Sequence, residues 1–324
     1  MASGEWVLFA TERAKRPHEA EPRQRLEQPK KDCPFEDLER SGQQVVWRVP
    51  DSDAWQVAVI KNKFPAVKDG LCGPGRQVGP FSVHDAIGAH DVFVFRDHER
   101  NLPDLSPDEM VSVVQAYKRR HRELMKADGC LKYAMVFHNF GIEAGASIAH
   151  PHSQVLAVPI LPPSVSRSLY GAFRYFKEQN KKVYDVMMIW EKEQGARIVW
   201  ENDYFVAFCP FASHRPGEVR IFPKNGGAHF NEMPDELDRY FAQALSVVLG
   251  KMKVALNDPA FNFFIHTAPA EQSMGDIHEY YSWHVEILPR LKIDAGFEMG
   301  TGVDINMVDP DEEARLLRDA EIKL

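Results

Sequence analysis

The residues with the clearest chemistry lie in one short segment, His150-Pro151-His152-Ser153-Gln154. An extended strand would place His150, His152 and Gln154 on one face, because side chains alternate along a strand. Two imidazoles and an amide on one face are costly to bury without a polar partner. A His-x-His pair alone is also found in purely structural settings. Together with the amide of Gln154 and the small residues just upstream, the segment nevertheless predicts a functional site.

The turn before this segment supports that interpretation. Residues 139–147 read NFGIEAGAS, and their small side chains would let a substrate approach the backbone closely. The elements that must position the two motifs follow from hydrophobic patterning. A helix is predicted from Pro107, with Ser106 and Glu109 as a capping box. Strands are predicted around it at 45–50, 55–60, 91–95, 133–140 and 150–160.

The second half of the chain repeats this order of elements. A helix is predicted from Pro234, and strands are predicted at 204–211, 218–224, 261–267 and 283–288. Too few helices separate the strands for a parallel, doubly wound sheet. We therefore expect an α+β fold of two duplicated units, 1–175 and 176–324, with an antiparallel sheet and flanking helices.

Composition narrows the class of protein. The 324 residues are 44% hydrophobic and 27% charged, which is ordinary for a folded globular chain. The net charge of −8 argues against nucleic acid as a partner. No apolar run approaches the roughly 20 residues that span a membrane, and no signal peptide is evident, so a cytoplasmic location is expected. The four cysteines do not predict a disulfide framework and are interpreted as unpaired thiols.

The segment NFGIEAGASIAHPHSQ resembles the active-site signature of galactose-1-phosphate uridylyltransferases, the transferase branch of the histidine-triad superfamily. Further segments resemble that family in the same order, namely ERAKRP at 12–17, DCPF at 32–35, residues 90–105 and residues 282–302. The forms CPF, NKFPA and AGFEMGTG also resemble plant-type ADP-glucose phosphorylases. The resemblance implies a duplicated histidine-triad fold over nearly the whole chain.

The resemblance also implies a mechanism with His152 as nucleophile. His152 would attack the α-phosphorus of a nucleotide sugar and release a sugar 1-phosphate, and a second phosphate would then accept the nucleotide. The favoured reaction converts UDP-glucose and galactose 1-phosphate to UDP-galactose and glucose 1-phosphate. The alternative is phosphorolysis of ADP-glucose or a dinucleoside polyphosphate. A non-catalytic nucleotide-binding protein is a third, weaker alternative.

Family motifs assign roles to several other residues. The ring of His152 would be held by the main-chain carbonyl of His150. Glutamine at position 154 is typical of the transferases and phosphorylases rather than the hydrolases. Substrate contacts are predicted for Arg13, Arg16, Asn62, Asn139, Ser147, Gln154, Lys292 and Glu298. Relatives form dimers that share their sites, so a homodimer is expected.

The family's zinc site maps to Cys33, Glu36, His98 and His150. Glu36 stands where many relatives carry cysteine, and because a carboxylate can also bind zinc we predict a zinc ion. A metal-free, hydrogen-bonded cluster is the alternative. For the second repeat we predict neither a metal site nor catalysis. His284-Val285-Glu286 is there aligned with His150-Pro151-His152, which puts a carboxylate in place of the nucleophile.

Overall fold

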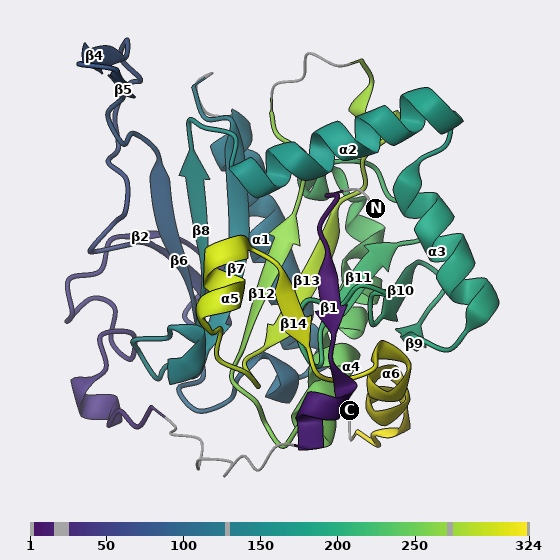
Figure 1. Ribbon diagram of the computed structural model, residues 1–324. Coiled ribbons are helices and arrows are strands. Elements are labelled where there is room, and N and C mark those ends of the chain that lie inside the picture. Colours follow the sequence, from purple (N-terminus) through teal and green to yellow (C-terminus); the bar gives the residue numbers. More distant parts are fainter. Residues whose placement is uncertain (1–2, 16–25, 127–129, 271–274, 323–324) are drawn as a thin grey trace.

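The computed structural model describes residues 3–15, 26–126, 130–270 and 275–322, and its centre is one antiparallel sheet (Figure 1). The ten strands run in the order β2-β3-β6-β8-β7-β12-β13-β11-β10-β9. The N-terminal half supplies β2 (Val45–Val49), β3 (Val57–Lys61), β6 (Ala89–Phe95), β7 (Tyr133–Phe140) and β8 (His152–Val158). The C-terminal half supplies β9 (Ile198–Glu201), β10 (Phe205–Phe208), β11 (Val219–Pro223), β12 (Phe261–His266) and β13 (His284–Pro289). The predicted α+β fold is confirmed.

Two long helices cover one face of the sheet and contact each other. They are α1 (Pro107–Lys126) and α4 (Asp238–Ala255). The predicted capping box is present, since Ser106 N donates to Glu109 (2.7 Å) and Glu109 N donates to Ser106 Oγ (3.3 Å). The second helix begins at Asp238 rather than Pro234, because a 3₁₀ turn, η6 (Asp235–Leu237), takes the first residues.

Two helices that the sequence analysis did not predict cover the other face of the C-terminal half. They are α2 (Pro163–Gln179) and α3 (Val183–Gln194), and they pack on Val206, Phe208 and Phe222. On the same face of the N-terminal half, loop residues including Cys33 and Phe35 pack on β3 and β6. This unequal covering leaves room for a cleft beside β7 and β8.

The remaining elements lie outside the main sheet. Strand β1 (Val7–Phe9) pairs in parallel with β14 (Asp304–Asn306), next to α5 (Gly296–Thr301) and α6 (Pro310–Asp319). The hairpin β4 (Arg76–Val78) and β5 (Phe81–Val83) projects from the body of the molecule (Figure 1). A disulfide joins Cys72, in the loop before this hairpin, to Cys130 after α1. The prediction of four unpaired thiols was therefore wrong for these two, because tertiary folding brings distant segments together.

The strand order supports an internal duplication, because the two halves of the sheet mirror each other and meet at β7 and β12. The division into 1–175 and 176–324 stays a prediction, since one hydrophobic core spans both halves. The predicted alignment of the repeats was wrong. His152 begins β8 and His284 begins β13, and each ring contacts the main-chain oxygen two residues earlier. His284 therefore corresponds to His152, and Glu286 corresponds to Gln154.

Candidate active site and metal centre

The ring of His152 is held by its own backbone. Its Nδ1 donates to the main-chain oxygen of His150 at 2.9 Å, which is the contact that the sequence predicted. The ring packs edge-on against Phe35, and the side chain is 7% exposed. Burial lowers the pKa of His152, so the ring is neutral near pH 7 and Nε2 carries a lone pair. A neutral imidazole in a fixed tautomer is the form that can attack phosphorus.

His152 borders a cleft of about 1210 Å³ between the N-terminal half and the end of α4. The turn before β8 forms part of its wall. Gly141 adopts φ +87°, and a Cβ there would lie 2.6 Å from that of Ala260, so only glycine fits this approach. Within the described residues, no arginine lines the cleft. Its other walls include Asn139, Glu143, Ala146, Ile148, His98, Asn101, Lys253 and Asp258.

The opposite face of β8 is locked into the core. Ser153 Oγ lies 2.5 Å from Tyr117 Oη on α1 and 2.9 Å from His138 Nδ1 on β7. His138 also stacks on Phe261 and Phe263. Burial lowers the pKa of His138 to about 3, so this imidazole stays neutral. The sequence analysis did not predict that His138 and Tyr117 hold Ser153. A histidine and a serine on two neighbouring predicted strands were the signal that could have indicated it.

Gln154 is oriented by a histidine that the sequence analysis did not single out, His90. His90 Nδ1 accepts from Ala66 N at 3.1 Å, so this nitrogen carries a lone pair and the ring proton lies on Nε2. That nitrogen lies 2.8 Å from Gln154 Oε1 and therefore donates to it. Asn62 Nδ2 lies 3.2 Å from the same ring nitrogen, and Asn62 Oδ1 accepts from Phe64 N. The predicted residues Asn62 and Gln154 thus meet around His90.

Of the other residues predicted to contact substrate, some lie at the cleft and others do not. Asn139 lines the cleft, and Ser147 is exposed between two cleft residues, Ala146 and Ile148. Arg13 is exposed in η1 (Thr11–Lys15) and is not among the cleft residues. Arg16 lies outside the described residues.

Lys292 and Glu298 also lie apart from the cleft residues. The two side chains form an ion pair with each other. Lys292 Nζ also donates to the main-chain oxygen of Ile305 on β14 at 2.8 Å. The structure therefore does not bring this pair to His152 within one chain.

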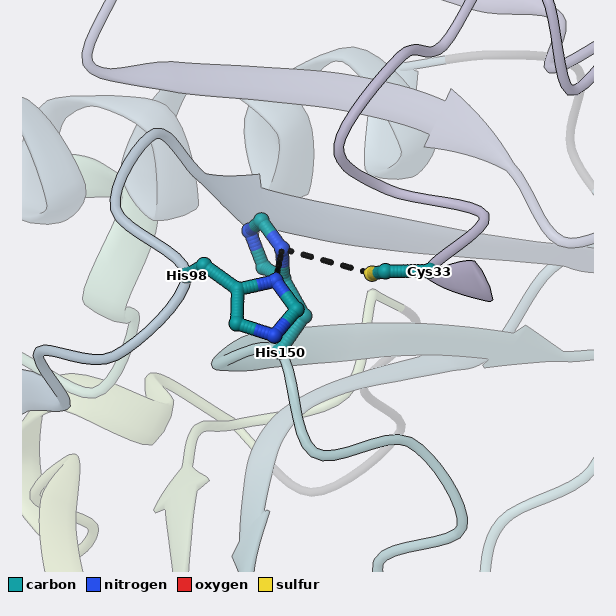
Figure 2. A group of neighbouring side chains, drawn as sticks. All are labelled: Cys33, His98 and His150. Atoms are coloured by element: carbon teal, nitrogen blue, oxygen red, sulfur yellow. Dashed lines mark hydrogen bonds between the residues drawn. The ribbon is translucent and has the colours of Figure 1, made fainter. Parts of the chain in front are cut away.

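Four electron-pair donors converge beside the cleft, as Figure 2 shows for three of them. His98 Nδ1 and His150 Nδ1 are 3.1 Å apart, and Cys33 Sγ lies 3.5 Å from the latter. Glu36 Oε2 lies 3.2 Å from His98 Nδ1 and 3.8 Å from His150 Nδ1. These are the four residues that the sequence predicted as metal ligands.

The hydrogen bonds made by the Nε2 atoms of His98 and His150 determine whether the Nδ1 atoms can bind a metal ion. His150 Nε2 contacts the main-chain oxygen of Phe95 at 2.6 Å, and His98 Nε2 contacts that of Gln28 at 2.9 Å. A carbonyl can only accept, so each ring proton lies on Nε2 and both Nδ1 atoms present lone pairs. Burial lowers the pKa of His150 to about 4, which keeps that ring neutral. Thiolate, carboxylate and two imidazoles form a donor set that fits a four-coordinate zinc ion.

A second group of possible ligands lies in the C-terminal half. One ligand atom from each of His266, His284 and Glu286 lies within 4.8 Å of the others. Arg220 Nη2 lies 3.5 Å from Glu286 Oε2, and His266 Nε2 lies 3.4 Å from the same oxygen. The guanidinium already balances the carboxylate, which disfavours a cation. The prediction of no second metal site stays a prediction.

Comparisons with known proteins agree with this geometry. The family model "Galactose-1-phosphate uridyl transferase, N-terminal domain" matches residues 1–162, which is half of the chain. A model of a domain of unknown function matches residues 82–321. The fold and the HPHSQ site therefore define a nucleotidyltransferase or phosphorylase of the histidine-triad superfamily. The chain belongs to the galactose-1-phosphate uridylyltransferase family.

The individual relatives differ in activity. The chain is 33% identical to ADP-glucose phosphorylase of Arabidopsis thaliana, over 98% of this chain and 90% of the relative. It is 30% identical to galactose-1-phosphate uridylyltransferase of Thermotoga maritima, over 99% and 96%. The crystal structure of an Arabidopsis ADP-glucose phosphorylase with bound ADP-glucose superposes with a TM-score of 0.85, at 32% identity over 99% of this chain and 97% of that one. No helix in the described part of the chain is long and apolar enough to cross a membrane.

Proposed function

We propose that this protein transfers a nucleoside monophosphate from a nucleotide sugar to a phosphate acceptor through a covalent adduct on His152. The observation that carries the proposal is the neutral, backbone-held ring of His152 at the wall of a large cleft. Nε2 attacks the α-phosphorus, and the bond from that phosphorus to the bridging oxygen breaks. The sugar 1-phosphate leaves, and an acceptor phosphate oxygen then displaces the histidine.

Neighbouring side chains divide the remaining work. The amide of Gln154 turns its oxygen to His90 and so can offer its NH₂ group to a phosphoryl oxygen. Asn139 and Ser147 offer further donors from the wall and the turn. Glutamine cannot give or take a proton as histidine can, so the adduct waits for a phosphate rather than for water. Asn62 N donates to the main-chain oxygen of His90 at 2.9 Å, and Asn62 resembles a nucleoside-contacting position of the family.

Zinc would be held by Cys33, Glu36, His98 and His150. When bound, it supplies a structural crosslink between the loop at 33–36, the residues after β6 and the start of β8. His150 also provides the carbonyl that fixes the tautomer of His152, so a zinc ion here would hold that carbonyl in place.

The choice of donor separates two reactions. Sequence motifs favoured UDP-glucose with galactose 1-phosphate as acceptor. The phosphorylase of 33% identity and the phosphorylase structure of TM-score 0.85 now support ADP-glucose with inorganic phosphate as the first candidate. The uridylyltransferase of 30% identity keeps UDP-glucose as the second candidate. In both reactions the substrate is a nucleotide sugar and the first product is a sugar 1-phosphate.

A homodimer is part of the proposal. Arg13, Lys292 and Glu298 resemble substrate-contacting residues, yet they lie apart from the cleft of their own chain. A second copy that presents its C-terminal segment would complete the site. Size-exclusion chromatography with light scattering tests this, and a monomer with full activity would contradict it.

The reaction itself is tested by intact-mass spectrometry after brief mixing with ADP-glucose or with UDP-glucose, without acceptor. An AMP adduct that disappears on adding phosphate supports the phosphorylase. A UMP adduct that disappears on adding galactose 1-phosphate supports the uridylyltransferase. If neither donor leaves an adduct, the proposed function is wrong.

A further inference from the structure

A chain of hydrogen bonds runs from the C-terminal half into the wall of the cleft. Asn262 lies on β12 directly opposite Asn139 on β7, and its side chain is 3% exposed. Arg290 follows β13, and its Nε donates to Asn262 Oδ1 at 2.5 Å. Asn262 Nδ2 donates to Asn139 Oδ1 at 2.7 Å and to the main-chain oxygen of Ala144 at 2.8 Å.

The polarity of this chain follows from the chemistry at its two ends. A guanidinium can only donate, so the atom of Asn262 that faces Arg290 must be the oxygen. A main-chain carbonyl can only accept, so the atom that faces Ala144 must be the nitrogen. Both ends therefore select the same orientation of the Asn262 amide. Asn262 therefore donates an N–H to Asn139, and the atom of Asn139 that accepts it is the side-chain oxygen.

The consequence reaches the cleft. With Oδ1 of Asn139 committed to Asn262, its Nδ2 has no protein acceptor in the described part of the chain. Asn139 lines the cleft beside His152, so this NH₂ group is available to a negatively charged oxygen there. Without the chain, an asparagine amide could turn over and present its oxygen, which would repel a phosphate.

We propose that Arg290 and Asn262 are positioning residues that keep the Asn139 amide turned as a donor to the phosphoryl group of the nucleotide. The inference rests on the proposed function, because it needs a phosphate in this cleft. It assigns a catalytic task to the C-terminal half, which orients a donor in the N-terminal site through two side chains. Asn262 also ties the turn at Ala144 to the same network.

The test is a double-mutant cycle on the steady-state kinetics of the complete reaction, with whichever donor leaves an adduct and with its acceptor present. Arg290→Met should lower kcat/KM about tenfold in the wild-type background, mainly through kcat. In an Asn139→Ala background the same substitution should have almost no further effect, because the group it orients is gone. Arg290→Lys, which still only donates, should recover most of the loss. Arg122→Met is the matched control, since Arg122 also bonds a carbonyl, that of Asn231, away from the cleft.

The outcomes separate this inference from the proposed function. A wild-type protein that forms no adduct with either donor overturns the proposed function and this inference with it. A wild-type protein that forms an adduct, while Arg290→Met reacts normally, overturns this inference alone. So does an equal loss in the Asn139→Ala background, which would mean that Arg290 acts only by stabilising the fold. Thermal unfolding of the Arg290 and Arg122 variants checks that they lose similar stability.

Discussion

The two halves of the sheet hold the same histidine in different surroundings. His152 and His284 each begin a strand, and each ring nitrogen Nδ1 contacts a carbonyl two residues earlier, at 2.9 and 3.1 Å. His152 faces the large cleft. His284 is instead packed between Phe222 and His266, with ring centroids 4.7 and 4.9 Å away. The backbone arrangement is therefore duplicated, but His152 borders a cleft of about 1210 Å³ and His284 one of only about 400 Å³.

Charge separates the halves further. Gln154 lies across from Val92 in the sheet, whereas Glu286, at the corresponding position, lies across from Arg220. Burial alone would raise the pKa of Glu286. Arg220 and His266 lower it by more than burial raises it, so the pKa lies well below the usual range of a glutamate. An ionised Glu286 has no N–H group to donate to a phosphoryl oxygen, whereas the amide of Gln154 has two. The comparison teaches that one neutral amide, rather than the histidine itself, distinguishes the half that carries the proposed nucleophile.

The largest expected effect separates the two histidines directly. His152→Ala should abolish adduct formation and transfer, a loss of at least about 10⁴-fold, because no other nucleophile replaces the imidazole. His284→Ala should retain the adduct in its folded fraction. Intact-mass spectrometry measures both. An adduct on the His152→Ala protein would sink the mechanism.

We expect the N-terminal half to bind a zinc ion and the C-terminal half to bind none. The purified protein should hold up to one zinc per chain by elemental analysis, and Cys33→Ala should lose it. Removal of a structural zinc should lower the melting temperature by about 10 °C or more. His266→Ala should keep the zinc. Full activity and stability in a protein without zinc would instead leave the Cys33 group as a hydrogen-bonded cluster.

The buried charges of the C-terminal half should be costly to disturb. Arg220→Met leaves the buried carboxylates of Glu218 and Glu286 without their cation and should cost about 3–5 kcal/mol in the free energy of unfolding. Arg119→Met, at an exposed ion pair with Glu123, should cost less than about 1 kcal/mol. Urea denaturation compares the two. Equal costs would mean that Arg220 is not needed to balance the pair.

Making the N-terminal site resemble the C-terminal one should impair it. Gln154→Glu puts a carboxylate beside His90 and next to the incoming phosphate, which should lower kcat/KM about 100-fold. Gln154→Asn keeps a neutral amide and should lose less. Steady-state kinetics with whichever donor leaves an adduct on His152 provides the measurement, and an unchanged kcat/KM in Gln154→Glu would show that this charge is irrelevant.

A further effect concerns acid stability of the N-terminal half. Burial lowers the pKa of His121 on α1 to about 4, against 6.5 for an unfolded histidine. Between those pH values the unfolded chain binds a proton that the folded protein does not. The contribution of His121 to stability should therefore be full above pH 6.5 and fall by about 1.4 kcal/mol per unit as the pH drops toward 4. His121→Gln, which keeps a donor for Ala134, should have a shallower slope in pH-dependent unfolding.

The sequence by itself determined much of the local structure and chemistry. The helix from Pro107 and the inner strands were predicted, because periodicity and capping are local. The ring contact of His152 and the four residues of the Cys33 group were predicted from the resemblance of short motifs to the family. Helices α2 and α3 were not predicted, and α4 began later than expected.

Only the tertiary structure decided which distant residues meet. It joined Cys72 to Cys130 and aligned His284 with His152. It also turned Gln154 toward His90 and linked Arg290 through Asn262 to Asn139. Each of these depends on strand register and on hydrogen-bond polarity across the sheet. Neither property is written in the spacing of residues along one chain, because a shift of one residue moves every side chain to the other face.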